Sequence, residues 1–229
     1  MDKLLVIHAH PNADAESSVS LQVLHHFLKA YGSLHPEGAI ERIDLYREDV
    51  PCIDSVFLSA RKKIQKEERL TEEEQRVASR TAELLRQFKS AKKYVIAMPL
   101  HNFNVPSKLK DYMDNILIPR ETYAYTDQGS VGLLKDGRNV LVIQASDGIY
   151  TNNDWYTEVE YSHQFLKSMF RFMGMDYRII RAQGIYRLGR EKVLQTAFQE
   201  AEAAAAFFAG VGNEAASGTA AGLAIDTIS

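Results

Sequence analysis

The loop that follows the apolar run KKYVIAM, residues 92–98, carries several side chains that suit ligand binding. It reads Pro99, Leu100, His101, Asn102 and Phe103 before a helical pattern begins at residue 107. Asn amides and main-chain groups offer both donors and acceptors, as the edge of a planar heterocycle requires, and Phe103 would border the space where a flat molecule stacks. Asn beside Pro is also ordinary turn chemistry. The loop alone leaves both interpretations open.

A second loop, HAHPNADAESSVS at residues 8–20, places Ser17, Ser18 and Ser20 where a helix begins. Free backbone N–H groups and the positive end of the helix dipole attract phosphate there, and hydroxyls add hydrogen bonds. The segment lacks the glycine patterns of dinucleotide folds and Walker loops, so a single monophosphate is the better expectation. Simple helix capping by serine is the alternative. His10 is expected to face the ligand crevice.

The third loop, Ala145, Ser146, Asp147 and Gly148, ends another apolar run. Glycine permits close approach of backbone to a ligand. Aromatic residues are dense on both sides of this loop, and they either line a pocket or simply pack. They are Tyr123, Tyr125, Tyr150, Trp155 and Tyr156.

The elements that must position these loops alternate along the chain. Apolar runs typical of strands buried on both faces occur at 3–8, 39–45, 92–98, 138–146 and 176–184. Helical spacing occurs at 20–31, 71–91, 107–117, 155–174 and 191–210. In the first helix, Leu21, Leu24, Leu28 and Tyr31 form the stripe expected to face inward.

This alternation predicts an α/β fold, a flavodoxin-like or Rossmann-like doubly wound five-stranded parallel sheet with helices on both faces. In such sheets the ligand crevice lies at the carboxyl ends of the strands, near the point where strand order reverses. We therefore expect the three loops to meet there. Residues 1–209 are expected to form one domain, and residues 210–229 a flexible or loosely packed C-terminal tail.

Composition excludes several function classes. The chain has 229 residues, of which 45% are hydrophobic, and a formal net charge of −3, so neither nucleic acid nor membrane is an expected partner. The single cysteine, Cys52, rules out a disulfide within the chain and a thiolate zinc cluster. No metal site is expected, and a reducing, cytoplasmic location is the default.

Several segments together resemble the family of FMN-dependent NADH azoreductases and NAD(P)H:quinone oxidoreductases, relatives of DT-diaphorase with a flavodoxin-like fold. The resemblance runs to about Gly210 and is carried by HAHP with Ser18-Val19-Ser20, PLHNFNVPSKLKDYMD, YAYTDQGSVGLLKDGRNVLVIQASDGIY, and FLKSMFRFMGMD followed by AQGI. The most specific part is the NFNxPxxLKxYxD segment that starts at Asn102.

The resemblance implies that Ser18, Val19 and Ser20 bind the FMN phosphate, with His10 nearby. It implies that residues 99–103 line the ribityl chain and the isoalloxazine ring, with Asn102 near N5 and His101 as a supporting group. Residues 145–148 would meet the pyrimidine end. Phe103 and Tyr125 would form the substrate pocket, the latter near the interface of a homodimer.

The chain departs from the family pattern at two places. His101 replaces a frequent Tyr, and Ser146-Asp147-Gly148 replaces an Arg-Gly-Gly type sequence. Asp147 near flavin N1 would disfavour the anionic reduced form and lower the reduction potential. Alternatively, Asp147 turns outward or accepts a hydrogen bond from flavin N3–H.

The family implies tightly but non-covalently bound FMN and a ping-pong cycle, in which NADH or NADPH reduces the flavin and a quinone or azo compound then receives two electrons. No catalytic side chain is needed, because flavin N5 carries the hydride. Two alternatives remain: a flavodoxin-type single-electron carrier, and a flavin-free hydrolase using His10, His101 and Asp147 as acid, base and orienter.

Overall fold

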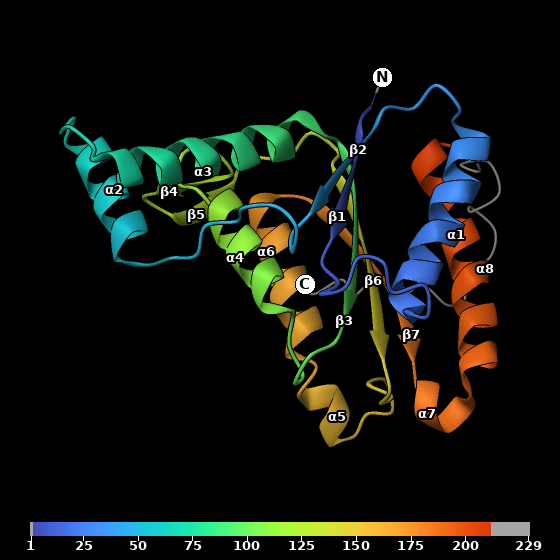
Figure 1. Ribbon diagram of the computed structural model, residues 1–229. Coiled ribbons are helices and arrows are strands. Elements are labelled where there is room, and N and C mark those ends of the chain that lie inside the picture. The colour runs from blue at the N-terminus through green and yellow to red at the C-terminus, as the bar shows by residue number, and fades with distance from the viewer. Residues whose placement is uncertain (1, 212–229) are drawn as a thin grey trace.

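The computed structural model describes residues 2–211. Its centre is a five-stranded parallel sheet in the order β2-β1-β3-β6-β7 (Figure 1). The strands are β1 (Leu4–His8), β2 (Ile40–Asp44), β3 (Lys93–Pro99), β6 (Asn139–Ser146) and β7 (Asp176–Gln183). The strand order reverses between β1 and β3, as in flavodoxin-like sheets. The fold class predicted from the sequence is confirmed.

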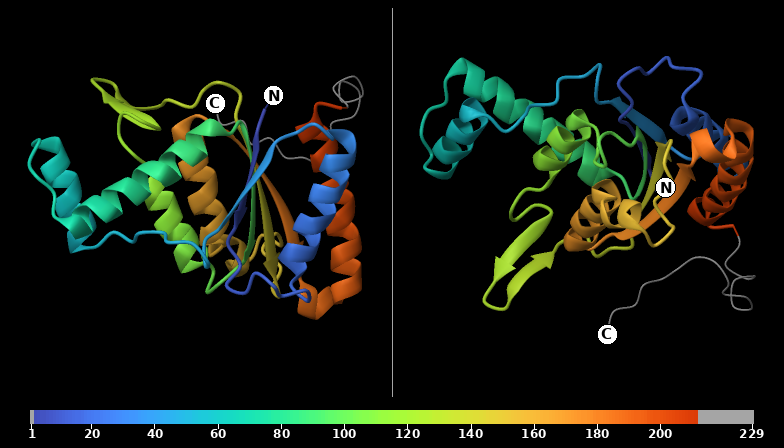
Figure 2. Two further views of the ribbon diagram at one scale, coloured as in Figure 1. Left: turned by 45° about the horizontal axis from the view of Figure 1, so that its top comes forward. Right: turned by 90° about the horizontal axis from the view of Figure 1, so that it is seen from below.

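Helices cover both faces of the sheet (Figure 2). One face packs against α1 (Val19–Leu34) and α8 (Arg190–Ala209), the other against α3 (Glu72–Ser90), α4 (Ser107–Ile116) and α6 (Tyr161–Met173). Because both faces are covered, successive strand residues enter opposite cores: Leu4 and Val6 pack with α1, and Leu5 and Ile7 with α3 and α4. The continuous apolar runs of β1, β3 and β6 follow from this arrangement. The expectation was wrong for residues 39–45, because β2 is an edge strand in which Ile40 is 39% exposed and only Ile43 is buried.

The inward face of α1 differs from the expected stripe. Leu24 and Tyr31 are buried as predicted, but Leu21 and Leu28 are only half-buried. Val23 and Phe27 fill the core in their place, and the Phe27 ring meets Phe208 of α8 edge-on at 5.7 Å between ring centroids. The helix is rotated toward α8, whose small Ala residues let the two helices approach closely.

Smaller elements complete the described residues. They are α2 (Ser55–Gln65), the antiparallel hairpin of β4 (Tyr123–Thr126) and β5 (Gly129–Gly132), α5 (Trp155–Glu158) and α7 (Ile185–Leu188). α2 packs against α3, away from the sheet (Figure 1). The single helix expected over 155–174 is interrupted between α5 and α6 at residues 159 and 160.

α8 ends at Gly210, whose left-handed conformation closes the helix. The main elements from β1 to α8 pack on the two faces of one sheet, and of the predicted tail only Gly210 and Val211 are described. The remainder of that tail, residues 212–229, lies outside the described residues.

Candidate functional site

The loops after β1, β3 and β6 meet at the carboxyl edge of the sheet. The Leu100 N–H donates to the Ala145 carbonyl at 2.8 Å, and the Ala9 N–H donates to the Ala97 carbonyl at 2.9 Å. These bonds continue the parallel ladders beyond the strands, so the three loops emerge side by side at the topological switch point. The sequence predicted this meeting of the three loops at the carboxyl edge of the sheet.

The start of α1 offers free hydrogen-bond donors. Ser18 caps the helix, and its Oγ lies 3.2 Å from the buried Ser20 Oγ. The N–H groups of Val19 and Ser20 donate to no acceptor within residues 2–211, and the first turn has no acidic residue. Two free N–H groups beside two hydroxyls suit a phosphate monoester.

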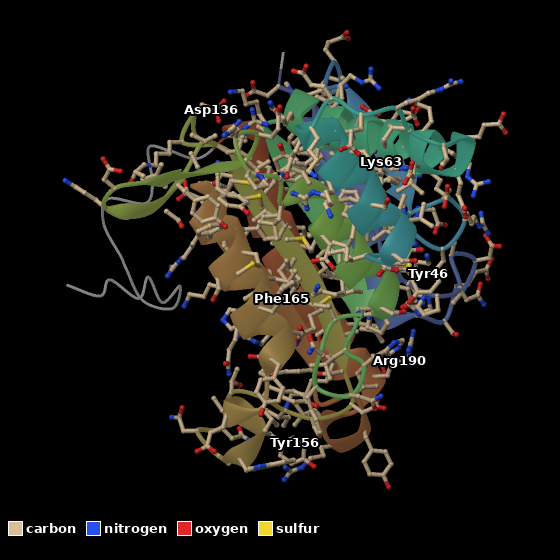
Figure 3. All side chains as sticks on the ribbon, turned by 90° about the vertical axis from the view of Figure 1, so that its left-hand side faces the viewer. Tyr46, Lys63, Asp136, Tyr156, Phe165 and Arg190 are labelled. Carbon is tan, nitrogen blue, oxygen red and sulfur yellow. The ribbon has the colours of Figure 1, made fainter. Side chains whose placement is uncertain are left out.

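Arg190 brings a positive charge to this loop, which sequence reasoning missed. From the start of α8 its guanidinium donates to the Ser17 carbonyl and to Gln22 Oε1. The contact joins residues 173 positions apart, and no local sequence pattern marks it. Figure 3 shows Arg190 toward the same end of the molecule as Tyr156.

The loop after β3 is a tight turn centred on Asn102 and Phe103, both with positive φ, 47° and 65°. Its ends are joined by two backbone hydrogen bonds between His101 and Asn104. Asn102 is exposed, and its side-chain amide has no partner among the described residues. A free amide with both donor and acceptor suits the polar edge of a flavin, so this turn and the start of α1 together fit FMN.

The loop after β6 is stabilised by two hydrogen bonds to its Gly148 carbonyl. The Ser146 hydroxyl donates to the Gly148 carbonyl at 3.0 Å, and the Gly184 N–H donates to the same carbonyl at 2.9 Å. Asp147 is exposed and lines a hollow of about 650 Å³ together with Tyr156 and the α7 segment.

Aromatic side chains border the turn. The Phe103 ring packs edge-on against Trp155 at 5.4 Å and against Tyr150 and Tyr156 at 6.4 Å each, measured between ring centroids. Trp155 is 57% exposed. Phe103 therefore packs among the aromatic residues that follow β6, and its role in a substrate pocket stays a prediction.

Tyr125 is the one candidate that the fold does not bring to the other site residues. It lies on β4 and is 73% exposed. The Leu134 N–H, just after the hairpin, donates to the carbonyl of Met173 at the end of α6, whereas the three loops lie near the start of α6. α6 has 13 residues, and at 1.5 Å per residue it is about 20 Å long. Tyr125 cannot reach the loops of its own chain.

The residues suggested for a hydrolase are not connected. The His10 Nδ1 contacts the backbone of Asn12, at 2.7 Å from its carbonyl oxygen and 3.0 Å from its nitrogen. Within residues 2–211 no hydrogen bond joins His10, His101 and Asp147. His8 is a further histidine near this edge. Burial lowers its pKa, although the carboxylate of Asp44 acts in the opposite direction.

The described residues contain neither a metal-binding cluster nor a membrane-spanning helix. No group of three or more His, Cys, Asp or Glu side chains is arranged to hold a metal ion within residues 2–211. Over the same residues, no helix is both long enough and apolar enough to cross a membrane.

Comparison with known proteins places the chain in a family. Residues 2–205 match the model of a family described by its flavodoxin-like fold. The chain is 59% identical over 207 residues to an FMN-dependent NADH:quinone oxidoreductase 1 of Bacillus cereus, covering 90% of this chain and 97% of that protein. It is 43% identical over 192 residues to the protein of the same name in Lactiplantibacillus plantarum, covering 82% and 89%.

Among solved structures, an FMN-dependent NADH-azoreductase from Bacillus anthracis in complex with FMN superposes with a TM-score of 0.89 at 59% identity, covering 91% of this chain and 100% of that one. The family model, matched over residues 2–205, spans all three loops of the candidate site. This chain therefore belongs to the flavodoxin-like family that contains the FMN-dependent NADH:quinone oxidoreductases and NADH-azoreductases.

Proposed function

We propose that this protein is an FMN-dependent oxidoreductase that transfers two electrons from NADH to quinones and azo compounds. The proposal rests on the meeting of three loops at the switch point. At one end, the start of α1 offers free N–H groups that can donate hydrogen bonds to a phosphate, and at the other end lies the free amide of Asn102. The names and 59% identity of the relatives supply the reaction class.

FMN, when bound, supplies the hydride chemistry, so the protein needs only to bind and orient. Ser18, Val19 and Ser20 would hold the phosphate through their hydroxyl and N–H groups, with His10 beside them. The turn at residues 99–103 would meet the ring edge, and Ala145 to Gly148 the pyrimidine end. Phe103 and its aromatic neighbours would exclude water from one side of the pocket.

Both substrates would use this one pocket in turn, which is a ping-pong cycle. NADH is the expected donor by relationship, and NADPH is the alternative to be tested beside it. Parallel double-reciprocal lines with NADH and menadione would agree with the proposal. Intersecting lines would contradict it.

The complete pocket would require two copies of the chain. Tyr125 is exposed and lies at the far end of α6 from the loops of its own chain. In a homodimer the β4–β5 hairpin of one copy would reach the pocket of the other. Light scattering of the purified protein tests this directly, and a monomer with full activity would contradict it. We place the enzyme in the cytoplasm, where NADH is available and Cys52 stays reduced.

The test of the flavin site uses two asparagines. Asn102→Ala is expected to weaken FMN retention or slow hydride transfer and to leave the fold intact, because its amide has no partner within the described chain. Asn139→Ala is the control, since Asn139 begins β6 at the opposite edge of the sheet, and among the described residues its side chain bonds to the Gly137 carbonyl alone. Wild-type flavin content and turnover in Asn102→Ala would refute the assignment.

A further inference from the structure

The turn at His101–Asn104 has a backbone that its sequence does not favour. Two reciprocal hydrogen bonds of 3.0 and 2.8 Å close it, and both central residues have positive φ, which is the type I′ geometry. Asn102 tolerates this conformation well. Phe103 does not, because its Cβ crowds the following carbonyl in the left-handed region. Contacts from elsewhere in the fold must hold Phe103 in place.

Two kinds of contact do so. The Phe103 ring packs against the Trp155, Tyr150 and Tyr156 rings, and the Phe103 carbonyl accepts the Ser162 N–H at 3.0 Å. Ser162 is the second residue of α6 and is fully buried. The N–H groups of a first helical turn have no partner within the helix, so the start of α6 donates one of them to the turn.

A buried polar network fixes the start of α6. The Ser162 hydroxyl donates to Gln144 Oε1 at 2.7 Å, and the Gln144 Nε2 donates to Glu160 Oε1 at 2.9 Å. Arg181 donates to both oxygens of Glu160, through Nε at 2.8 Å and Nη2 at 2.9 Å. Gln144 and Glu160 are 1% and 3% exposed. The network therefore joins β6, β7 and α6 beneath the turn.

The charge of Glu160 sets the direction of these bonds. An ionised carboxylate only accepts hydrogen bonds, so Gln144 must point its NH₂ toward Glu160 and its oxygen toward Ser162. The Ser162 hydroxyl must then donate to Gln144. Glu160 precedes α6 as its N-cap residue, but its side chain reaches inward to Arg181 and makes no side-chain cap bond to the helix. The Ser162 N–H is therefore left to donate to the Phe103 carbonyl.

We propose that Glu160, Gln144 and Ser162 are positioning residues for the turn at His101–Asn104, acting through the Phe103 carbonyl, and that they thereby set the affinity and reduction potential of the bound flavin. The inference rests on the proposed function, because it assumes that this turn meets FMN. It adds to that function a set of residues that touch neither FMN nor substrate. A network that served only to fill the core would leave the properties of the flavin unchanged.

The test is Glu160→Gln, which keeps the shape and removes the charge that orders the network. Its matched control is Glu74→Gln. Glu74 is similarly buried, at 5% exposure, and accepts from Lys63 at 2.7 Å and Ser59 at 2.6 Å. It joins α2 to α3, and Figure 3 shows Lys63 toward the opposite end of the molecule from Tyr156.

Four quantities are measured on each purified variant: the FMN dissociation constant, the midpoint potential of the bound flavin, its visible circular dichroism, and the urea midpoint. We expect Glu160→Gln to weaken FMN binding by up to about tenfold, the limit reached when the loss of one charged hydrogen bond in the network is passed on in full to the turn. The potential and the dichroism are expected to shift as well. Glu74→Gln is expected to lower the urea midpoint and leave all three flavin properties at their wild-type values.

Ser162→Ala is the second variant, in case Glu160→Gln does not fold. It keeps the N–H that binds Phe103 and removes only the link to Gln144, so a smaller change in the same direction is expected. Wild-type affinity and potential in the folded variants would overturn the inference and leave the proposed function intact. A wild-type chain that binds no FMN would overturn both.

Discussion

Gly184 offers a stability prediction that can be worked out from the structure. It follows β7 in the left-handed conformation, with φ 77° and ψ 27°, and its N–H donates to the Gly148 carbonyl at 2.9 Å. A Cβ built at this position would lie 2.8 Å from Ile149 Cγ1 and 3.1 Å from Leu188 Cδ1. Gly184→Ala is therefore expected to destabilise the protein in two ways.

The left-handed backbone costs an alanine about 1–2 kcal/mol, and forcing a methyl group into occupied space costs about 1–3 kcal/mol. Together these give a loss of about 2–5 kcal/mol in the free energy of unfolding. Gly210→Ala separates the two contributions. Gly210 has nearly the same backbone, φ 74° and ψ 15°, but a Cβ there meets no atom of residues 2–211 within 4 Å, so only the conformational cost of about 1–2 kcal/mol is expected.

Urea unfolding of both variants and the wild type, followed by circular dichroism, gives the three free energies. FMN titration adds a functional measurement, because a shift of Gly184 moves the Gly148 carbonyl that lines the candidate site. We expect weaker FMN binding in Gly184→Ala and unchanged binding in Gly210→Ala. Equal unfolding free energies in the two variants would refute the assigned contact with Ile149.

Three further predictions concern capping and pH. Ser18→Ala removes the α1 cap and is expected to cost about 1 kcal/mol in urea unfolding and to weaken FMN binding; full FMN affinity would argue against a phosphate site there. Hydrogen bonds from Lys63, Ser59 and the Thr71 N–H lower the pKa of Glu74 from 4.5 to about 2. The stabilisation of the folded protein by ionised Glu74 is therefore complete above pH 4.5 and is lost as pH falls toward 2. In Glu74→Gln, the urea midpoint should no longer show this fall in stability across the same pH range. Burial lowers the pKa of His163 from 6.5 to about 4. The unfolded chain then binds more protons than the folded protein, so stability falls as pH drops from 6.5 toward 4. His163→Gln should flatten this part of the curve of unfolding free energy against pH, and an unchanged curve would contradict the buried neutral imidazole.

The sheet and the location of the site could be predicted from sequence because each central strand is buried on both faces. Runs such as KKYVIAM are too short for a buried helix and too apolar for an exposed strand, and parallel connection then places the loops at one edge. Gln144 also marks the buried network in the sequence. A polar residue within the apolar run RNVLVIQAS indicates a buried hydrogen-bonded partner.

Other features depend on contacts between distant residues and left no local pattern. At the break before α6, Glu160 pairs with Arg181, 21 positions away. The type I′ turn lacks its usual Asn-Gly signature, because Phe occupies the second central position. The buried face of α1 packs against α8, which the spacing of the α1 leucines alone does not indicate. The β4–β5 hairpin has few buried residues, so no core pattern marked it.

The placement of Tyr125 at the far end of α6 has a genetic consequence for the proposed homodimer. A chain disabled at Tyr125 and a chain disabled at Asn102 would each form inactive assemblies alone. In a mixed dimer, the intact loops of the Tyr125 variant would meet the intact hairpin of the Asn102 variant. One of the two pockets would then work. Co-expression of two dead alleles would then restore up to half the activity per mixed assembly, through interallelic complementation.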